Sequence, residues 1–386
     1  MEAKSSELSY PESAPERPLR VLLDGRKLGD GGIGVYTENL IEGLLEIGGV
    51  SITVIYRDEA ARRAPYADRI AWIYDRARPY SLDEMLFMSR RIDFSRFDVF
   101  HTPHYVLPFG ITIPSVITVH DLIHISHPER FFYPAIARFL IGSSVRRADG
   151  VLTVSRHTRA GVLDLTGAAE EKVRLAPNAI SRRILHGLQR GGSSATPNPY
   201  LFALFSNNKP HKGLADLVTA YRIFRESGAW RSVTPTCPEL VLAGFGLTAL
   251  SREGARNSVV GNVEGVRVIG ALSDSELRSY LGAAHALVVP SLVEGFCLPA
   301  LEAQASGTPV VCRPVPALKE IVTERDTVAT DFSVAALKDA IVAGLEKSVG
   351  APRGVSGSNL DFFSCKRVAM IVRSEYERVV GARSFR

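Results

Sequence analysis

The chain has 386 residues, of which 46% are hydrophobic and 23% are charged, and these proportions argue against a disordered or fibrous protein. Its length exceeds one typical core and predicts two α/β domains of roughly 150 to 200 residues each. The 46 Lys and Arg residues outnumber the 41 Asp and Glu residues, and the formal charge of +5 favours anionic ligands such as nucleotides or a phospholipid surface. The basic residues occur in scattered pairs rather than in runs, so nothing demands nucleic acid as a partner.

The four cysteines lie far apart and form no C-x-x-C spacing, which argues against a disulfide framework or a structural zinc site. No apolar stretch reaches the roughly 18 residues that a membrane span requires, and the N-terminus lacks the pattern of a signal peptide. We therefore expect a cytoplasmic protein, whose basic surface would also allow peripheral contact with the inner face of the membrane.

The first half of the chain alternates predicted strands with helical stretches. Residues 1–18 mix Ser, Glu and Pro without hydrophobic periodicity and predict a flexible tail. Residues 19–23 predict a strand, which leads through a glycine-rich turn into a helix over 35–47. Further strands are predicted over 51–56, 99–101, 115–119 and 151–154. This alternation is typical of a parallel sheet with helices on both of its faces.

The pattern stops and restarts in the middle of the chain. After Leu185 a segment rich in Gly, Ser and Pro predicts the domain boundary. A capping box that begins at Ser273 predicts a helix to about residue 284, and residues 366–380 predict an amphipathic helix. The remaining predicted elements are a helix over 213–226 and strands over 200–205, 239–243, 266–269 and 286–289.

The densest motif is the segment PSLVEGFCLPALE, residues 290–302, which places Glu294 and Glu302 eight positions apart at a strand-to-helix junction. If the helix begins near Leu298, the free backbone N–H groups of residues 296–298 favour a phosphate at its N-terminus. Glu302 would then lie one turn into the helix, within reach of a ribose. The spacing alone is equally compatible with a surface Glu294 and an ordinary acid at a helix start.

Two further segments are rich in lysine and glycine. In SNNKPHKG, residues 206–213, Lys209 and Lys212 could neutralise a diphosphate, although a solvated lysine pair is the simpler alternative. Residues 29–34, GDGGIG, match G-x-G-x-x-G and allow a dinucleotide-binding interpretation. The predicted strand ends near Leu23 or Asp24, however, so the first glycine arrives late for that fingerprint. A purely structural glycine turn is a further alternative.

A predicted strand ends at the segment TVHDL, where open α/β sheets place their ligands. His120 could contact a sugar there and Asp121 could orient it, although a lone histidine is more often structural. His101 and His104, in the segment FHTPH, could line an acceptor site or belong to a packed turn.

These segments together resemble family 4 of the retaining glycosyltransferases. SLVEGFCLPALEAQASGTPVV resembles the E-x7-E signature of the family, and SNNKPHKG is similar to its basic pyrophosphate loop. DGRKLGDGGIGVYTENL resembles its glycine-rich first loop, and FDVFHTPHYVLP and VHDLIH resemble its acceptor-domain segments. LAPNAI, residues 175–180, resembles a family segment near the crossing between the domains, which makes Asn178 a candidate for the cleft. The resemblance extends over residues 19–380, with these motifs in the order of the family.

The resemblance implies the α/β fold called GT-B, in which two Rossmann-like domains face a deep cleft. Residues 19–187 would form the acceptor-side domain and residues 198–362 the domain that binds the donor nucleotide. Residues 363–386 would form a helix that crosses back and packs on the first domain.

The resemblance also assigns roles to single residues. Glu294 and His120 would lie at the donor sugar, Glu302 would bind the ribose hydroxyls, and Lys209 and Lys212 would neutralise the diphosphate. Cys297 stands where the family often has glycine. The residues whose loops would contact the donor phosphates are Gly32, Gly34, Gly295, Phe296, Cys297 and Leu298.

We therefore expect a retaining hexosyltransferase that uses GDP-mannose, with a UDP-sugar as the close alternative, and a saccharide or lipid-linked acceptor. The nucleotide sugar is a co-substrate, and no cofactor is expected. No metal is expected either, because the chain contains no D-x-D motif. Two other hypotheses are an NAD-dependent oxidoreductase that uses the loop at 29–34 and a catalytically silent protein that binds sugar nucleotides.

Overall fold

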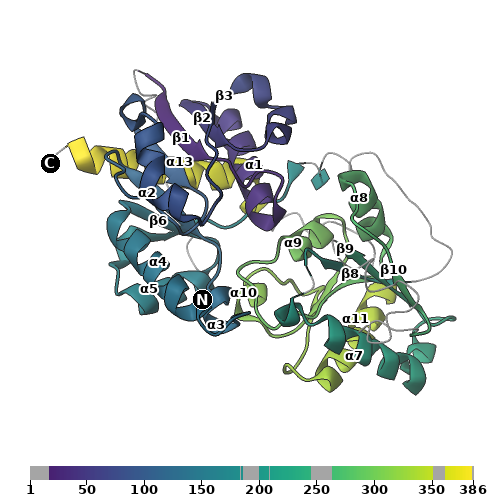
Figure 1. Ribbon diagram of the computed structural model, residues 1–386. Coiled ribbons are helices and arrows are strands. Elements are labelled where there is room, and N and C mark those ends of the chain that lie inside the picture. The colour runs from purple at the N-terminus through teal and green to yellow at the C-terminus, as the bar shows by residue number, and fades with distance from the viewer. Residues whose placement is uncertain are drawn as a thin grey trace, which may run out of the picture.

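The structure is a computed structural model that describes residues 17–182, 184–185, 200–207, 209–244, 263–350 and 361–384. It contains two parallel sheets, each covered by helices (Figure 1). The first sheet has the strand order β3-β2-β1-β4-β5-β6-β7. Its strands are β1 (Leu19–Asp24), β2 (Val50–Tyr56), β3 (Ala71–Tyr74), β4 (Val99–Thr102), β5 (Ser115–Val119), β6 (Gly150–Thr153) and β7 (Val173–Leu175).

The second sheet has the order β10-β9-β8-β11-β12-β13. Its strands are β8 (Tyr200–Phe205), β9 (Glu239–Gly244), β10 (Val266–Val268), β11 (Ala286–Val289), β12 (Val310–Cys312) and β13 (Thr327–Val328). In each sheet the order reverses beside the first strand, between β1 and β4 and between β8 and β11. Ligands of such sheets bind outside the carboxyl ends of the strands at this reversal.

The helices cover both faces of each sheet. In the first half they are α1 (Gly31–Ile47), α2 (Leu82–Arg91), α3 (Ile123–Ser126), α4 (Tyr133–Arg147) and α5 (Arg156–Thr166). In the second half they are α7 (Leu214–Ser227), α8 (Asp274–Ala283), α9 (Leu298–Ala305), α10 (Pro316–Lys319), α11 (Val334–Gly350) and α13 (Cys365–Ser384). None of the helices in the described part of the chain is long and apolar enough to cross a bilayer.

The last helix, α13, packs on the first sheet although it follows the second in sequence (Figure 1). It lies so close to α1 that a Cβ atom on Gly43 would come within 2.3 Å of the carbonyl oxygen of Cys365. From α13 the buried Tyr376 hydroxyl reaches Nδ1 of His101 on β4, at 2.6 Å. These contacts confirm the predicted crossing helix and the GT-B architecture of two Rossmann-like domains.

Most of the predicted elements are present, with bounds that differ by a residue or two. The last helix and the first helix are exceptions, because α13 extends to Ser384 and not only to residue 380, and α1 begins at Gly31 and not at residue 35. Glycines disfavour helix by propensity, but Gly34 is buried where a Cβ would lie 2.6 Å from the carbonyl oxygen of Lys27. Close packing of the loop onto the first turn therefore requires glycine at that position.

Four short strands, β3, β7, β12 and β13, were not predicted. Each spans only two to four residues. The capping box at Ser273 is confirmed, because its hydroxyl accepts from the backbone N–H of Glu276 while Glu276 accepts from that of Ser273. The predicted tail and the predicted linker after Leu185 fall, apart from residues 17 and 18, outside the described residues, and so do residues 351–360.

Candidate active site

Four loops follow the strands at the two reversals, and they carry the motifs that the sequence singles out. In the second domain, β8 leads into the lysine segment and β11 leads into the segment 290–297. These two loops are joined, because the N–H of Leu292 donates to the carbonyl oxygen of His211 at 2.8 Å. A Cβ on Gly213 would lie 2.3 Å from the carbonyl oxygen of Pro290, so the contact tolerates no side chain there. The fold thus brings the predicted diphosphate loop and the first predicted acid together.

Glu294 and Lys212 form an ion pair at the centre of this contact. Nζ of Lys212 lies 2.7 Å from Oε1 of Glu294, and the Ser291 hydroxyl donates to the same oxygen at 2.7 Å. Burial lowers the pKa of Lys212, but the adjacent Glu294 carboxylate outweighs burial and leaves that pKa raised. Glu294 is only 9% exposed, so the alternative in which it is a surface residue is wrong.

The helix α9 begins at Leu298 as predicted, and Cys297 is its N-cap. Cys297 has φ of 82°, in the left-handed region that favours glycine, and this conformation costs a side chain roughly 1–2 kcal/mol. Burial raises the pKa of its thiol, so the sulfur stays protonated at neutral pH. The N–H groups at this helix start follow Glu294 closely in the chain, and Lys212 pairs with Glu294, so the helix dipole and the lysine both favour an anion here.

Gly295 lies at a close contact between the two domains. A Cβ atom on Gly295 would come within 2.0 Å of the carbonyl oxygen of His120, at the end of β5. A second contact crosses nearby, because the Glu320 carboxylate accepts from the N–H groups of Arg156 and His157 at 2.8 Å each, at the start of α5. The carboxyl ends of the two sheets therefore meet, and His120 lies opposite the loop of Glu294.

His120 is held in one orientation. Its Nε2 lies 2.9 Å from the carbonyl oxygen of Pro103, which can only accept, so Nε2 carries the proton. The Tyr36 ring packs edge-on against the imidazole with centroids 4.8 Å apart. Burial lowers the pKa of His120 to about 4. The ring is therefore neutral at pH 7, and Nδ1 can accept a hydrogen bond.

Glu302 lies one turn into α9, at the position that the motif predicts. It is 8% exposed, and among the described residues no side chain donates a hydrogen bond to its carboxylate. Burial raises its pKa to about 7, and the charge of Asp274 adds to the shift. A buried carboxylate without donors costs free energy unless a ligand supplies them.

We expect Glu302→Gln to stabilise the protein at neutral pH but not at acid pH. The pKa rises from 4.5 to about 7 on folding, so between these values the folded state holds a proton that the unfolded state has lost. Stability therefore falls as the pH rises through this window, by on the order of 3 kcal/mol, whereas glutamine does not titrate. Thermal unfolding of both proteins at about pH 4 and about pH 8 measures the difference.

Glu226→Gln is the matched control, because Glu226 is exposed on α7. It should shift the melting temperature equally at both pH values. A Glu302→Gln effect of the same size at both pH values would contradict a raised pKa at Glu302.

The remaining candidate residues differ in their contacts. Nζ of Lys209 lies 2.6 Å from a carboxylate oxygen of Glu129, an ion pair between the two domains. Gly32 is exposed at the start of α1 with open space around it, while Gly34 is buried. Phe296 packs its ring against Phe363, with centroids 5.6 Å apart. Asn208 lies outside the described residues.

His101 and His104 do not line an acceptor site. Both are at most 1% exposed. His101 bonds Tyr376 and the Thr118 hydroxyl, and His104 bonds the carboxylate of Asp24 at 3.2 Å. The packed-turn interpretation is therefore the correct one. Asn178 is buried as well, and its side-chain oxygen has no hydrogen-bond partner within the described residues.

One group of described side chains could hold a metal ion by geometry, namely Asp24, Glu84 and His104. The Arg26 guanidinium is hydrogen-bonded to both of these carboxylates. It supplies the positive charge at the centre of the group, so these residues form a buried ion-pair network at the end of β1.

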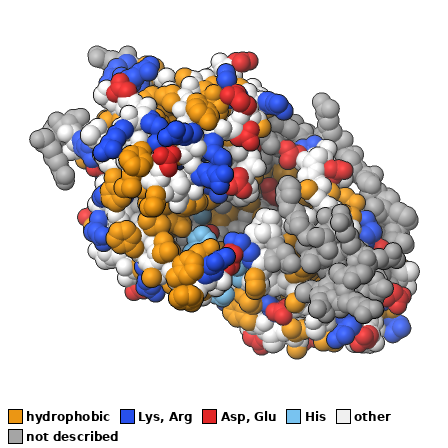
Figure 2. Space-filling model, in the orientation of Figure 1, with side chains coloured by type: hydrophobic (Ala, Val, Ile, Leu, Met, Phe, Trp, Pro, Cys, Tyr) orange, Lys and Arg blue, Asp and Glu red, His pale blue; other side chains and the backbone are white. Residues whose placement is uncertain are grey.

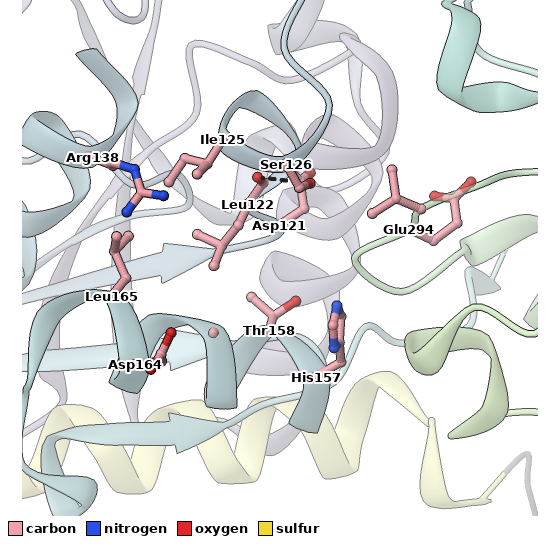
Figure 3. Close-up of a pocket in the computed structure, with 12 residues that line it drawn as sticks. Asp121, Leu122, Ile125, Ser126, Arg138, His157, Thr158, Asp164, Leu165 and Glu294 are labelled. Carbon is pink, nitrogen blue, oxygen red and sulfur yellow. Dashed lines mark hydrogen bonds between the residues drawn. The ribbon is translucent and has the colours of Figure 1, made fainter. Parts of the chain in front are cut away.

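A cavity of about 320 Å³ opens beside Glu294, between α3, α4 and α5 (Figure 3). Asp121, His157 and Glu294 line it together with apolar side chains such as Leu122 and Ile125. Figure 3 shows Arg138 and Asp164 on the side of the cavity that lies away from Glu294. The cavity is therefore lined by side chains of both charge signs, and its apolar wall lies next to the predicted sugar site.

Several residues of the site escaped the sequence analysis. Ser291 was within reach, because it precedes Glu294 by three positions in the main motif. Glu129 and Glu320 carry no local signal, since their partners lie on other elements of the chain, and Arg138 and Asp164 line the cavity from α4 and α5. Only the folded chain brings them to the cleft.

Two family models match the chain, "Glycosyltransferase Family 4" over residues 30–183 and "Glycosyl transferases group 1" over residues 189–350. An O-antigen chain mannosyltransferase of Salmonella typhimurium is 26% identical over 58% of this chain and 58% of its own length. The MMP alpha-(1->4)-mannosyltransferase of Mycolicibacterium hassiacum is 29% identical over 69% of this chain and 66% of its own length. The matches thus span about three fifths to two thirds of these relatives.

Solved structures share the architecture over nearly the whole chain. Sucrose-phosphate synthase of Thermosynechococcus elongatus has a TM-score of 0.67 at 17% identity and covers 94% of this chain and 100% of its own. Anabaena HepE, solved in complex with UDP and glucose, has a TM-score of 0.67 at 17% identity and covers 93% and 100%. At these identities the likeness establishes the fold. None of these matches supports the oxidoreductase hypothesis.

Proposed function

Because this chain belongs to glycosyltransferase family 4, we propose that it transfers mannose from GDP-mannose to a saccharide or lipid-linked acceptor, with retention at the anomeric carbon. The ion pair of Lys212 and Glu294 at the start of α9 is the observation that carries the assignment of the donor site. Mannosyltransferases among the relatives support the choice of mannose. A UDP-sugar is the second candidate, because HepE was solved with UDP and glucose.

In this proposal the diphosphate binds at the N-terminus of α9 with Lys212 beside it. Lys212 and the helix dipole then stabilise the negative charge that grows on the leaving diphosphate. Lysine and backbone N–H groups take the role that a metal ion has in other transferases, so we propose that transfer is metal-independent.

The sugar would lie between Glu294 and His120, which face each other across the domain contact. The Glu294 carboxylate stabilises the positive charge that develops on the sugar ring, and the neutral His120 accepts a hydrogen bond through Nδ1. The acceptor attacks from the same face, and the departing diphosphate takes its proton. Contact of the two domains excludes water, which would otherwise hydrolyse the donor.

Glu302 would bind the ribose. Its buried carboxylate lacks donors among the described residues, and two ribose hydroxyls would supply them. Hydrogen bonds to the ionised form would lower the raised pKa of Glu302, so donor affinity should increase as the pH rises through about 7.

A thermal-shift screen of nucleotides in the presence of EDTA tests the proposal. A ligand that binds only the folded state raises the melting temperature. We expect GDP and GDP-mannose to stabilise the protein without metal, and UDP alone to do so if the second candidate is correct. Stabilisation by NAD(H) alone, or by no nucleotide, would overturn the proposed function. Binding without transfer to any acceptor would indicate the catalytically silent protein.

A further inference from the structure

The helices α2 and α4 carry apolar side chains on two sides. Their inner sides bury Met88, Ala137 and Ile141 in a core that covers one face of the first sheet. Their outer sides and the segment before α4 carry large apolar side chains that no element of the described part of the chain covers. These are Leu82, Leu86, Phe87, Phe131, Ile136 and Phe139, which we call the α2–α4 face. Phe131 is 94% exposed, Leu82 68% and Phe139 64%.

A further exposed aromatic residue, Phe109, lies between α2 and α4. The N–H of Phe109 donates to the carbonyl oxygen of Met85 on α2 at 2.8 Å, and the Arg147 guanidinium on α4 lies over the Phe109 ring at 4.3 Å. The segment around Phe109 therefore ties the two helices together. Figure 2 shows hydrophobic side chains gathered over this part of the first domain. Scattered apolar residues need no explanation, but a gathered patch indicates an interaction surface.

The unpaired charges on the same elements are positive. The exposed arginines Arg90, Arg130, Arg138 and Arg146 form no ion pair within the described residues. The acids there are already satisfied, since Asp83 pairs with Arg91 and Glu129 pairs with Lys209. An apolar face with unpaired arginines fits a bilayer that contains anionic lipids, because aromatic and aliphatic side chains enter the interface while arginines meet the headgroups.

We propose that the α2–α4 face binds the surface of a membrane rich in anionic lipids. The candidate site is continuous with this face, because Arg138 on α4 both lines the cavity beside Glu294 and lies between Ile136 and Phe139 in the chain. A membrane docked on the face brings lipid-borne head groups to the mouth of the cavity. Of the two acceptor classes, this favours the lipid-linked saccharide, a conclusion that rests on the proposed function.

Co-sedimentation with vesicles tests the surface. We expect the protein to bind vesicles of equal parts phosphatidylcholine and phosphatidylglycerol, and to bind pure phosphatidylcholine much more weakly. The double variant Phe131→Ser/Phe139→Ser should lose at least about tenfold in affinity, because two exposed aromatic side chains no longer enter the bilayer. Arg130→Gln/Arg146→Gln should reduce binding to the anionic vesicles only, and added salt should do the same to the wild type.

Phe332→Ser is the matched control, because Phe332 is exposed on the second domain. It should bind the vesicles like the wild type. No binding of the wild type to anionic vesicles, or equal losses in the control and the double variant, would overturn the proposal. A third result would also overturn it. In that case the wild type forms a dimer in sedimentation equilibrium, Phe131→Ser/Phe139→Ser does not, and neither protein binds vesicles.

Vesicle binding is measured without donor or acceptor, so it is independent of the transfer reaction. A protein that binds vesicles but is not stabilised by any nucleotide would retain the surface and lose the proposed function. Stabilisation of both double variants by GDP to the wild-type extent would show that their folds and donor sites are intact.

Discussion

Replacing Glu294 with glutamine is expected to lower the rate constant of sugar transfer by on the order of 10²–10³. The glutamine keeps the shape and can still accept from Ser291 and Lys212, which both bond the same oxygen of Glu294. It removes the negative charge that would stabilise the developing charge on the sugar. Steady-state kinetics with the nucleotide sugar that stabilises the protein, together with a suitable acceptor, measures the loss.

The expected loss appears in kcat and in kcat/KM alike, because the charge acts in the transition state. Glu226→Gln, on the exposed side of α7, is the control and should leave both constants unchanged. A higher KM with an unchanged kcat in Glu294→Gln would contradict a role at the reacting sugar. The fold of this variant needs its own check by circular dichroism at the assay temperature, because the Lys212 ammonium loses its paired charge where its side chain is 18% exposed.

Lys212→Ala is expected to reduce both donor affinity and transfer, again by on the order of 10²–10³ in kcat/KM. Lys212 has a raised pKa and therefore carries a full positive charge at neutral pH. Its removal leaves the leaving diphosphate without that charge. Isothermal titration with the nucleoside diphosphate and steady-state kinetics measure the two losses separately.

Lys366→Ala is the matched control, because Lys366 is exposed on α13. The fold of Lys212→Ala needs its own check, since Glu294 loses its partner in a site where its side chain is 11% exposed. Circular dichroism at the assay temperature provides that check. Unchanged transfer and donor affinity in a folded Lys212→Ala protein would remove Lys212 from the site.

The double variant Glu294→Gln/Lys212→Ala shows whether the two side chains act together. Their atoms lie 2.7 Å apart, so their effects should couple. We expect a combined loss that is smaller than the product of the two single losses, as for residues in one network. If the two single losses multiply in the double variant, Glu294 and Lys212 act independently and contact different parts of the donor.

The amino-acid sequence by itself determined the alternation of strands and helices. Buried strands of a parallel sheet are short apolar runs, so β5, β8 and β11 appear in the sequence with the bounds of the structure. The start of α9 lies at Leu298, where the motif placed it, and Pro299 suits the first turn of a helix. Motifs that follow these strands could be placed at the carboxyl edge of each sheet for the same reason.

Other features depend on residues far apart in the chain, and only the tertiary structure decided them. Gly295 meets the carbonyl oxygen of His120, and Glu320 accepts from the N–H groups that begin α5, although each pair is separated by more than one hundred residues. His101 is buried by Tyr376 of the crossing helix, which no local pattern near His101 indicates.

Burial is the physical reason why the sequence predicts the elements but not these long-range contacts. The periodicity of side chains reports what neighbouring residues do, so it predicts elements and the loops that follow them. The raised pKa of Glu302 and the lowered pKa of His120 come from loss of water, and that loss occurs only when separate elements close around the group. Sequence therefore determined which residues stand at the cleft edges, and packing decided their partners and charges.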